Sequence, residues 1–409
     1  CDSASAIPRT TMVRRSTTTV TIPDTTPVPA RPAISARIPA PGPRNRPRRP
    51  CPLPRRIALL PSLRSTPHYT RNSGHLRSLE RHEKAIEVLS RAAALYPHHA
   101  GARFSAGLCY QNLGRFEDSL TAFDETIKLQ PRHEEALYSK GRSLNRLERF
   151  DDAIRSFNRA VEIEPGHAQA WYGKGVSLQS LGRDVEALPA LGSAIRIEQS
   201  NPLFHYYKGE SLRRLGRYRE AIRSLDTSLT LDESSAAVWY SRGESQRCLD
   251  RFDEAVESFD RSMAISDTDA ATWFGKGESL RSLSRFQDAL ASYGRALELN
   301  DRVAGSWLGK AECLRFLHNF DLALECYEKA LNIAPTAPAL HGKGACLAML
   351  ESFEKSISAF DLAIAAVPRH QQDWFGKGES LRRLDRFEEA ITALNRALEL
   401  DDRDAAAWH

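Results

Sequence analysis

The tryptophans of this chain recur at a fixed interval, and that interval constrains the fold more than any other feature. Successive Trp residues are separated by 68, 34, 34, 67 and 34 positions. A period of 34 residues indicates an array of equivalent structural units. The units are numbered here so that Trp holds position 4. The six residues are Trp171, Trp239, Trp273, Trp307, Trp374 and Trp408.

The 34-residue frame divides most of the chain into ten units. They begin at Thr66, Ala100, Glu134, Ala168, Pro202, Ala236, Ala270, Ala304, Ala337 and Gln371. Position 14 is Leu in all ten units, and positions 8 and 20 are Gly and Ala in eight units each. The sequence therefore predicts a repeat array over residues 66–404, and residues 405–409 begin an unfinished eleventh unit.

Each unit has the pattern of two helices. Apolar or small residues recur at positions 4, 8, 11 and 14 and again at 17, 20, 24, 27 and 28, which are helical spacings. Pro at position 32 of several units, such as Pro131 and Pro165, ends the second helix. One hairpin of this size cannot bury both of its apolar faces, so each hairpin is expected to pack on the next. The prediction is an all-α stack of hairpins.

The residues that recur at fixed positions of the units resemble those of the tetratricopeptide repeat (TPR) family. They are Trp at position 4, Gly at 8, Ala at 20, an aromatic residue at 24, Ala at 27 and often Pro at 32. Residues 270–303 are a representative unit. The resemblance implies a right-handed α-solenoid of about ten stacked helix-turn-helix repeats, with a concave groove that holds peptides. The first unit departs from the pattern at Tyr69, Ser73 and His82, so its opening helix is only weakly indicated.

Residues 1–65 have a different composition from the array. They hold twelve Arg, no Lys, two Asp and thirteen of the 22 prolines, which gives a charge of +10. The remaining 45 basic and 50 acidic residues give the array a charge of −5. The sequence predicts a disordered basic Pro/Arg/Thr-rich tail. Its segment Arg44 to Arg56 is either a contact for nucleic acid or an acidic surface, or an inert linker.

The cysteines and the two ends of the sequence bear on location and assembly. The seven Cys include no CxxC pair, which indicates free thiols and a cytoplasmic location. A second interpretation is lipid anchoring, with Cys1 as a processed lipoprotein N-terminus. No apolar run reaches the roughly 20 residues of a membrane span. The unfinished unit at Trp408 and His409 predicts that the polypeptide continues, or that the uncapped C-terminal end self-associates.

No arrangement of reactive residues points to catalysis, and we predict no catalytic residue, metal site or cofactor. The Gly- and Lys-containing strings 376–380 and 305–310 lack the spacing of a phosphate-binding loop and lie inside predicted helices. Four histidines share position 34, but equivalent positions lie about one repeat apart and cannot share a metal. These are His99, His133, His167 and His370.

A candidate partner-binding surface follows from one stripe of the first helix. Positions 2, 5, 9, 12 and 13 share a face opposite the packed one, and the family resemblance places this stripe in the concave groove. Position 5 is mostly aromatic, position 9 often Glu and position 12 often Arg. The predicted partner-binding residues are Tyr172, Tyr206, Glu210, Arg213, Tyr240, Glu244, Arg247, Phe274, Glu278, Arg281, Glu312 and Arg315. Alternatively, the charges neutralise each other and the rings pack on adjacent units.

The leading functional hypothesis is a non-catalytic scaffold that binds a peptide or protein segment in this groove. The groove lacks the Lys and Asn set with which some family members clamp a C-terminal carboxylate, and it lacks an Asn ladder. The alternative is a substrate-recruiting region of a larger enzyme whose catalytic domain lies outside this chain. RNA binding is a third hypothesis, disfavoured because the array is net acidic.

Overall fold

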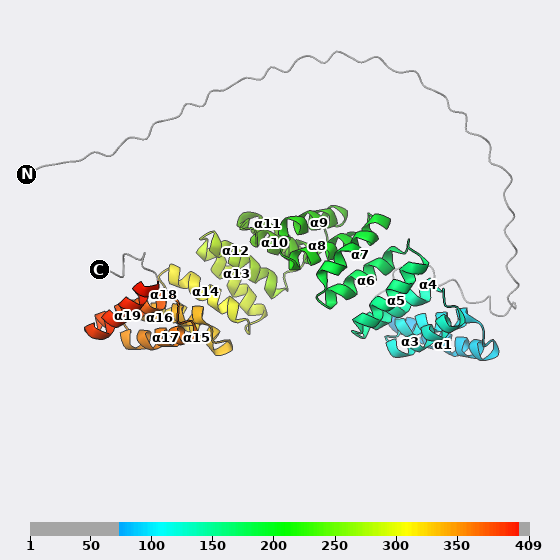
Figure 1. The fold of residues 1–409 in the computed structure, drawn as a ribbon, viewed down its shortest axis with the longest axis horizontal. Coiled ribbons are helices and arrows are strands. Elements are labelled where there is room, and N and C mark those ends of the chain that lie inside the picture. Colours follow the sequence, from blue (N-terminus) through cyan, green and yellow to red (C-terminus); the bar gives the residue numbers. More distant parts are fainter. Residues whose placement is uncertain (1–72, 401–409) are drawn as a thin grey trace, which may run out of the picture. The chain divides into compact units, whose positions relative to one another are not determined.

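The computed structural model describes residues 73–400, and in this part of the chain every regular element is an α-helix (Figure 1). The helices are α1 (Ser73–Leu95), α2 (Ala100–Asn112), α3 (Phe116–Leu129), α4 (Glu134–Arg146), α5 (Phe150–Ile163), α6 (Ala168–Ser180), α7 (Asp184–Ile197), α8 (Pro202–Arg214), α9 (Tyr218–Leu231), α10 (Ala236–Arg247), α11 (Phe252–Ile265), α12 (Ala270–Ser282), α13 (Phe286–Leu299), α14 (Ala304–Phe316), α15 (Phe320–Ile333), α16 (Ala337–Met349), α17 (Phe353–Ala366), α18 (Gln371–Arg383) and α19 (Phe387–Leu400).

From α2 onward the helices form hairpins, α2 with α3 through to α18 with α19. The second helix of each hairpin also packs against the first helix of the next one, and Figure 1 shows the hairpins following one another in chain order. The predicted all-α stack of helical hairpins is confirmed. None of the described helices is long and apolar enough to cross a membrane.

The turn inside each hairpin uses one left-handed residue at position 15. In the hairpin of α4 and α5 this residue is Glu148, with φ of 57°, and the amide of Arg149 then donates to the carbonyl of Leu144 at 2.9 Å. This hydrogen bond spans six residues and closes the helix end as a Schellman motif does. Gly114 and other glycines adopt the same conformation without the steric cost that a side chain brings.

The first unit is where the structure departs from the predicted hairpins. Helix α1 runs without a break through Leu79 and Glu80, where the frame placed a turn. Elsewhere the turn has an aromatic residue at position 17 or a glycine at position 15, and the first unit has neither, since His82 and Glu80 hold these positions. The described part of this unit is therefore a single helix that packs on α2.

Several predictions fall outside the described residues. They are the tail 1–65 with its basic segment 44–56, the N-terminal Cys1, and the start of an eleventh unit at 405–409.

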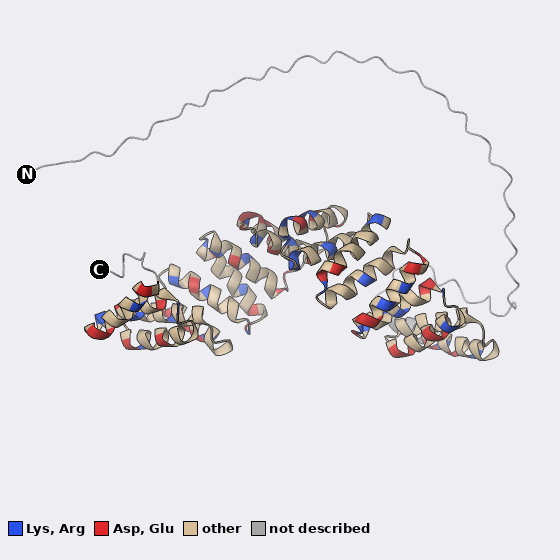
Figure 2. Cartoon of the chain, viewed as in Figure 1, with Lys and Arg blue, Asp and Glu red and all other residues tan. Residues whose placement is uncertain are grey.

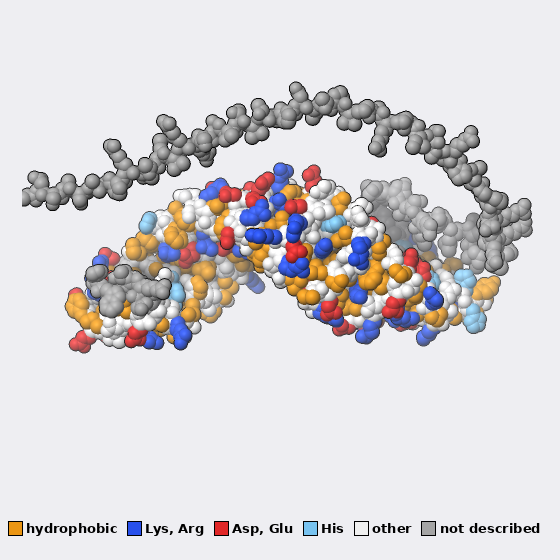
Figure 3. Space-filling view, turned by 45° about the horizontal axis from the view of Figure 1, so that its top comes forward, with side chains coloured by type: hydrophobic (Ala, Val, Ile, Leu, Met, Phe, Trp, Pro, Cys, Tyr) orange, Lys and Arg blue, Asp and Glu red, His pale blue; other side chains and the backbone are white. Residues whose placement is uncertain are grey.

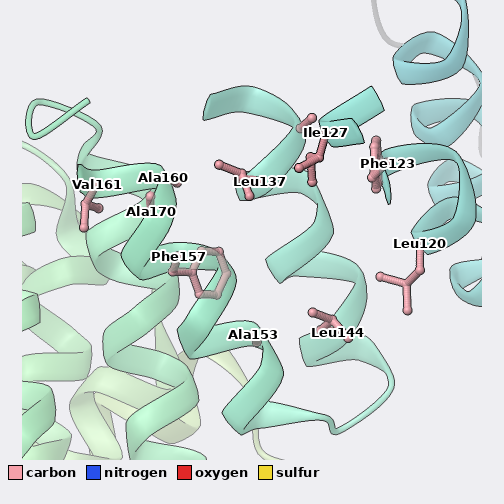
Figure 4. Packing of buried hydrophobic residues seen from close by; sticks show 11 residues of the cluster. Leu120, Phe123, Ile127, Leu137, Leu144, Ala153, Phe157, Ala160, Val161 and Ala170 are labelled. Carbon is pink, nitrogen blue, oxygen red and sulfur yellow. The ribbon is translucent and has the colours of Figure 1, made fainter. Parts of the chain in front are cut away.

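The core consists of large side chains at position 24, each held between two first helices. Phe157 of α5 is fully buried, and a β-carbon on Gly141 or Gly173 would come within 2.6 Å of its ring. Figure 4 shows Phe157 beside Ala153 of the same helix. The equivalent fully buried rings are Phe123, Phe259, Tyr293 and Tyr327.

Five of the tryptophans that reveal the repeat lie in the described residues, at the edge of this core, and all five are half-buried: Trp171, Trp239, Trp273, Trp307 and Trp374. The indole N–H of Trp273 donates to the carbonyl of Asp267 at 3.0 Å, six residues earlier, and so ties the first helix to the loop before it. Lys276 stands 5.8 Å from the centre of the ring and also pairs with Asp260 of the preceding unit at 2.6 Å. The tryptophan at position 4 therefore helps to link its unit to the preceding one, in addition to filling space.

Candidate partner-binding face

The predicted partner-binding residues all lie on first helices of consecutive hairpins. We call positions 5, 9 and 12 of these helices the first-helix face. Tyr172 is in α6. Helix α8 carries Tyr206, Glu210 and Arg213, α10 carries Tyr240, Glu244 and Arg247, α12 carries Phe274, Glu278 and Arg281, and α14 carries Glu312 and Arg315. The structure places equivalent residues one repeat apart along the array.

Each Glu at position 9 forms an ion pair with the Arg at position 12 of the same helix. Arg213 donates two hydrogen bonds to the carboxylate of Glu210, at 3.1 and 3.0 Å. Arg247 donates two hydrogen bonds to Glu244, at 3.1 and 2.9 Å. The i,i+3 spacing brings the two side chains together on the helix surface. Acidic and basic residues are intermixed along the helices (Figure 2), and their side chains are intermixed on the face that Figure 3 shows.

In two units a tyrosine changes this ion pair. The phenol of Tyr293 donates to Glu278 at 2.5 Å, and Arg281 keeps only the other carboxylate oxygen, at 2.8 Å. The same arrangement recurs one unit on, where Tyr327 and Arg315 share Glu312. The Nε atoms of Arg281 and Arg315 are left without a hydrogen-bond partner. These two guanidinium groups thus use only part of their donor capacity.

The position-5 rings are half-buried and pack on neighbouring residues. Tyr240 lies 6.1 Å from the ring of Phe259, and Phe274 lies 6.1 Å from Tyr293. Tyr172 reaches the next unit, where its ring is 5.3 Å from that of Tyr207. Each ring therefore packs with one part on its own hairpin or on the next one and keeps the rest at the surface, as aromatic side chains at interfaces do.

Burial and charge shift the ionisation of this face. Burial opposes ionisation of Glu210, but the hydrogen bonds from Arg213 and Ser241 outweigh it and hold the pKa of the carboxyl below its usual range. Burial, followed by the negative charge of Glu244, raises the pKa of Tyr240 to about 12. At neutral pH the Glu210–Arg213 pair is therefore ionised and the phenol of Tyr240 is neutral.

Sequence reasoning missed the part that Tyr293 and Tyr327 play in this face. It treated position 24 as a hydrophobic core column, and the rings are indeed fully buried. The available signal was the exchange of Phe for Tyr within that column, because a buried phenol needs a hydrogen-bond partner. The neighbouring unit, with Phe259 at the same position, has no such donor.

The recurring histidines at position 34 cap first helices. Nδ1 of His99, His133 and His167 accepts a hydrogen bond from the amide of the third residue of the following helix, at 3.0 to 3.2 Å. Such a cap satisfies one of the free amides at a helix start. His370 is different, because its Nδ1 faces the carboxylate of Asp373.

Several solved structures are similar to this chain. Among solved structures, that of YrrB, described as a TPR protein with an unusual peptide-binding site, is 24% identical with a TM-score of 0.42, and the match covers 46% of this chain and 96% of that chain. PilF of Pseudomonas aeruginosa is 18% identical, with a TM-score of 0.46 and coverage of 51% and 97%. The APC/C hetero-tetramer Cut9-Hcn1 is 17% identical, with a TM-score of 0.40 and coverage of 80% and 79%.

No curated protein matches the sequence. Models of the tetratricopeptide repeat match residues 75–132, 110–166, 138–202, 206–270, 274–338 and 372–404. Because these matches cover more than half of its residues, the chain belongs to the tetratricopeptide repeat family.

Proposed function

We propose that this protein is a non-catalytic scaffold that binds a peptide or protein segment along the first-helix face between α6 and α14. The observation that carries the proposal is the pair of partly used guanidinium groups, Arg281 and Arg315, in adjacent units. The side chains of Arg281 and Arg315 are 34% and 27% exposed, so part of each guanidinium group faces solvent. A partner that supplies carbonyl or carboxylate oxygens at this spacing would accept hydrogen bonds from the exposed N–H groups.

The rings at position 5 supply the apolar part of the same surface. Tyr206, Tyr240 and Phe274 stand in consecutive units beside the Glu–Arg pairs. Aromatic residues and Arg are the side chains most enriched among those that dominate binding energy at protein interfaces. Because the rings are already packed on their neighbours, little side-chain entropy is lost when a partner covers them.

The pairing of the arginines favours a protein partner over RNA. From α8 to α14, each position-12 Arg has a carboxylate within 3.0 Å. Phosphate binding depends on unpaired positive charge, and here the positive charge is neutralised. An uncharged or mixed-charge segment with exposed backbone oxygens fits the face better than a polyanion.

A capture experiment tests the proposal. The full chain and a double variant, Tyr240→Ala with Arg281→Glu, are used to select binders from a library of displayed peptides. Arg295→Glu, a charge reversal on α13 outside the first-helix face, is the control. We expect the wild type and the control to enrich the same peptides and the double variant to lose them. Equal enrichment by all three proteins would refute this face as the binding surface.

A further inference from the structure

The unit formed by α16 and α17 and its junction with α18 break the pattern of the array at two positions. Position 3 of the first helix is an apolar or small residue in the other hairpins, such as Ala339, but in α18 it is Asp373, which is only 1% exposed. Position 5 is His341 in α16, where most units have an aromatic ring. A buried carboxylate without partners is costly by several kcal/mol, so this Asp needs compensation.

Two histidines from different elements provide that compensation. Nδ1 of His341, in α16, lies 2.7 Å from one oxygen of Asp373, and Nδ1 of His370, in the loop before α18, lies 2.8 Å from the other. The two imidazole rings are 5.3 Å apart and nearly perpendicular. One donor atom of each of the three residues falls within 4.8 Å of the others. The cluster joins two consecutive units.

Helix capping, which accounts for the other position-34 histidines, does not account for His370. In His99, His133 and His167 the Nδ1 atom accepts from a backbone amide. In His370 the same atom points to a carboxylate. The change coincides with the two departures at Asp373 and His341, so three exceptional features of the array meet at one place.

We propose that His341, His370 and Asp373 form a binding site for a divalent transition metal ion, with Zn²⁺ as the representative ion. Two imidazole nitrogens and one carboxylate oxygen are ligands suited to Zn²⁺, whereas Ca²⁺ and Mg²⁺ prefer all-oxygen sites. Water fills the remaining coordination position, as in three-ligand zinc sites. Both histidines are partly exposed, at 25% and 42% of their side chains, so that water can reach the site.

Metal binding requires the three ligand atoms, which lie within 4.8 Å of one another, to move into a tetrahedral arrangement. Ligand atoms about 2.0–2.1 Å from a tetrahedral ion lie roughly 3.3 Å from each other, and the two Nδ1–carboxylate distances are 2.7 and 2.8 Å. The metal replaces the Nδ1 protons, and each neutral imidazole then carries its proton on Nε2.

The expected consequence is a metal-dependent clamp between α16 and α18. An ion that binds the folded junction and not the unfolded chain stabilises the fold by mass action. Because coupling in a repeat array is between neighbours, the stabilisation should be greatest around the last two hairpins.

Two substitutions test the site while restoring the pattern of the array. Asp373→Ala gives position 3 the residue that α16 has there, and His341→Phe gives position 5 the ring that Phe375 supplies in α18. Asp373→Ala removes the buried carboxylate itself, whereas His341→Phe leaves it with His370 as its remaining side-chain partner. The matched control is His167→Ala, which removes a capping histidine from a junction that has no carboxylate at position 3.

The experiment titrates Zn²⁺ into chelator-treated full-length chain by calorimetry and repeats the titration with each variant. Wild type and His167→Ala are expected to bind one equivalent more than either Asp373→Ala or His341→Phe. Saturating Zn²⁺ is expected to raise the Tm of the wild type and not that of Asp373→Ala. Equal stoichiometry in wild type and Asp373→Ala, or no binding to the wild type, would overturn the proposal. The cluster would then be only a buried carboxylate that is hydrogen-bonded to two histidines.

Discussion

Gly173 lies directly against the ring of Phe157, so that a β-carbon on this glycine would come within 2.6 Å of ring atom Cζ. The two residues belong to successive units, α6 and α5. The ring cannot move away, because Gly141 of its own hairpin confines it from the other side. The contact between the two units therefore depends on the absence of a β-carbon at position 173.

We expect Gly173→Ala to destabilise the array around α5 and α6 by about 1–3 kcal/mol, the usual cost of overpacking a core. Gly192→Ala is the control, because a β-carbon at this helical glycine in α7 meets nothing within 4 Å. Because Ala has a higher helix propensity than Gly, Gly192→Ala should stabilise the fold by up to about 1 kcal/mol. Hydrogen exchange checks both changes, and equal protection of α5 and α6 in the two variants would contradict this account of the contact.

The same contact shows what the sequence could and could not predict. The period, the two helices per unit and the stacking were readable because Leu at position 14 and Gly at position 8 recur in register. The near neighbour of the glycine at position 8 is the position-24 side chain, as with Gly141 and Phe157. Where position 24 holds Leu191, position 6 of the next unit is Tyr207, whereas the unit after Phe157 has Gly173 there. Tyr207 packs against the cluster that contains Leu191. Such compensation between units is visible only in three dimensions.

The sequence predicted which residues share the first-helix face, but not their contacts with other helices. Sequence spacing placed Glu278 and Arg281 on one face, and the structure shows their ion pair. The hydrogen bond from Tyr293 joins two helices, so no spacing rule within one helix reveals it. The cluster at Asp373 was missed for a similar reason, since it joins positions 34, 5 and 3 and only equivalent positions were compared.

The ion pair between Arg213 and Glu210 should contribute to stability, because Glu210 is only 8% exposed. Arg213→Met leaves the carboxylate without its main partner and should cost about 1–3 kcal/mol at pH 7. The matched control is Arg382→Met in α18, whose partner Glu379 has a 39% exposed side chain. There the loss should be much smaller, because solvent screens an exposed ion pair. Urea denaturation measures both changes.

The pH dependence of the Arg213→Met variant gives a further check. In the wild type the pKa of Glu210 is lowered, so its contribution is present above about pH 4.3 and is lost as the pH falls through the folded-state pKa. In the variant burial remains and the pKa should rise, so protonation relieves the buried charge. The difference between variant and wild type should therefore shrink from pH 7 to pH 5. A difference that stays constant would show that the charge of Glu210 is not the cause.

Tyr240 should make the array sensitive to alkali. Its pKa is raised to about 12 by burial and by Glu244, while an unfolded tyrosine titrates near pH 10. A group with a raised folded-state pKa loses its stabilising contribution as the pH rises through this window. Tyr240→Phe keeps the ring and removes the phenol, so its urea midpoint should fall less than that of the wild type between pH 10 and 12. Tyr96→Phe, on a ring that is 50% exposed, is the control and should follow the wild type.

Thiol labelling should separate the cysteines of the array by burial. Cys248 is exposed, whereas Cys313 and Cys346 are fully buried at position 10. Burial raises the pKa of each buried thiol to about 12, with Arg281 and Arg315 respectively opposing the shift. At pH 8 such a thiol is ionised to about one part in 10⁴, and the thiolate is the reactive form.

Iodoacetamide at pH 8 should therefore modify Cys248 within minutes and modify Cys313 and Cys346 only when their hairpins open. Peptide mass mapping resolves each site separately. Gly309→Ala provides a directed test, because its β-carbon would come within 2.4 Å of the ring of Tyr293 and disturb the junction between α13 and α14. Labelling of Cys313 in α14 should then accelerate more than that of Cys346 in α16, since destabilisation passes mainly between neighbouring units. Equal acceleration at the two cysteines would show instead that the array opens as a single cooperative block.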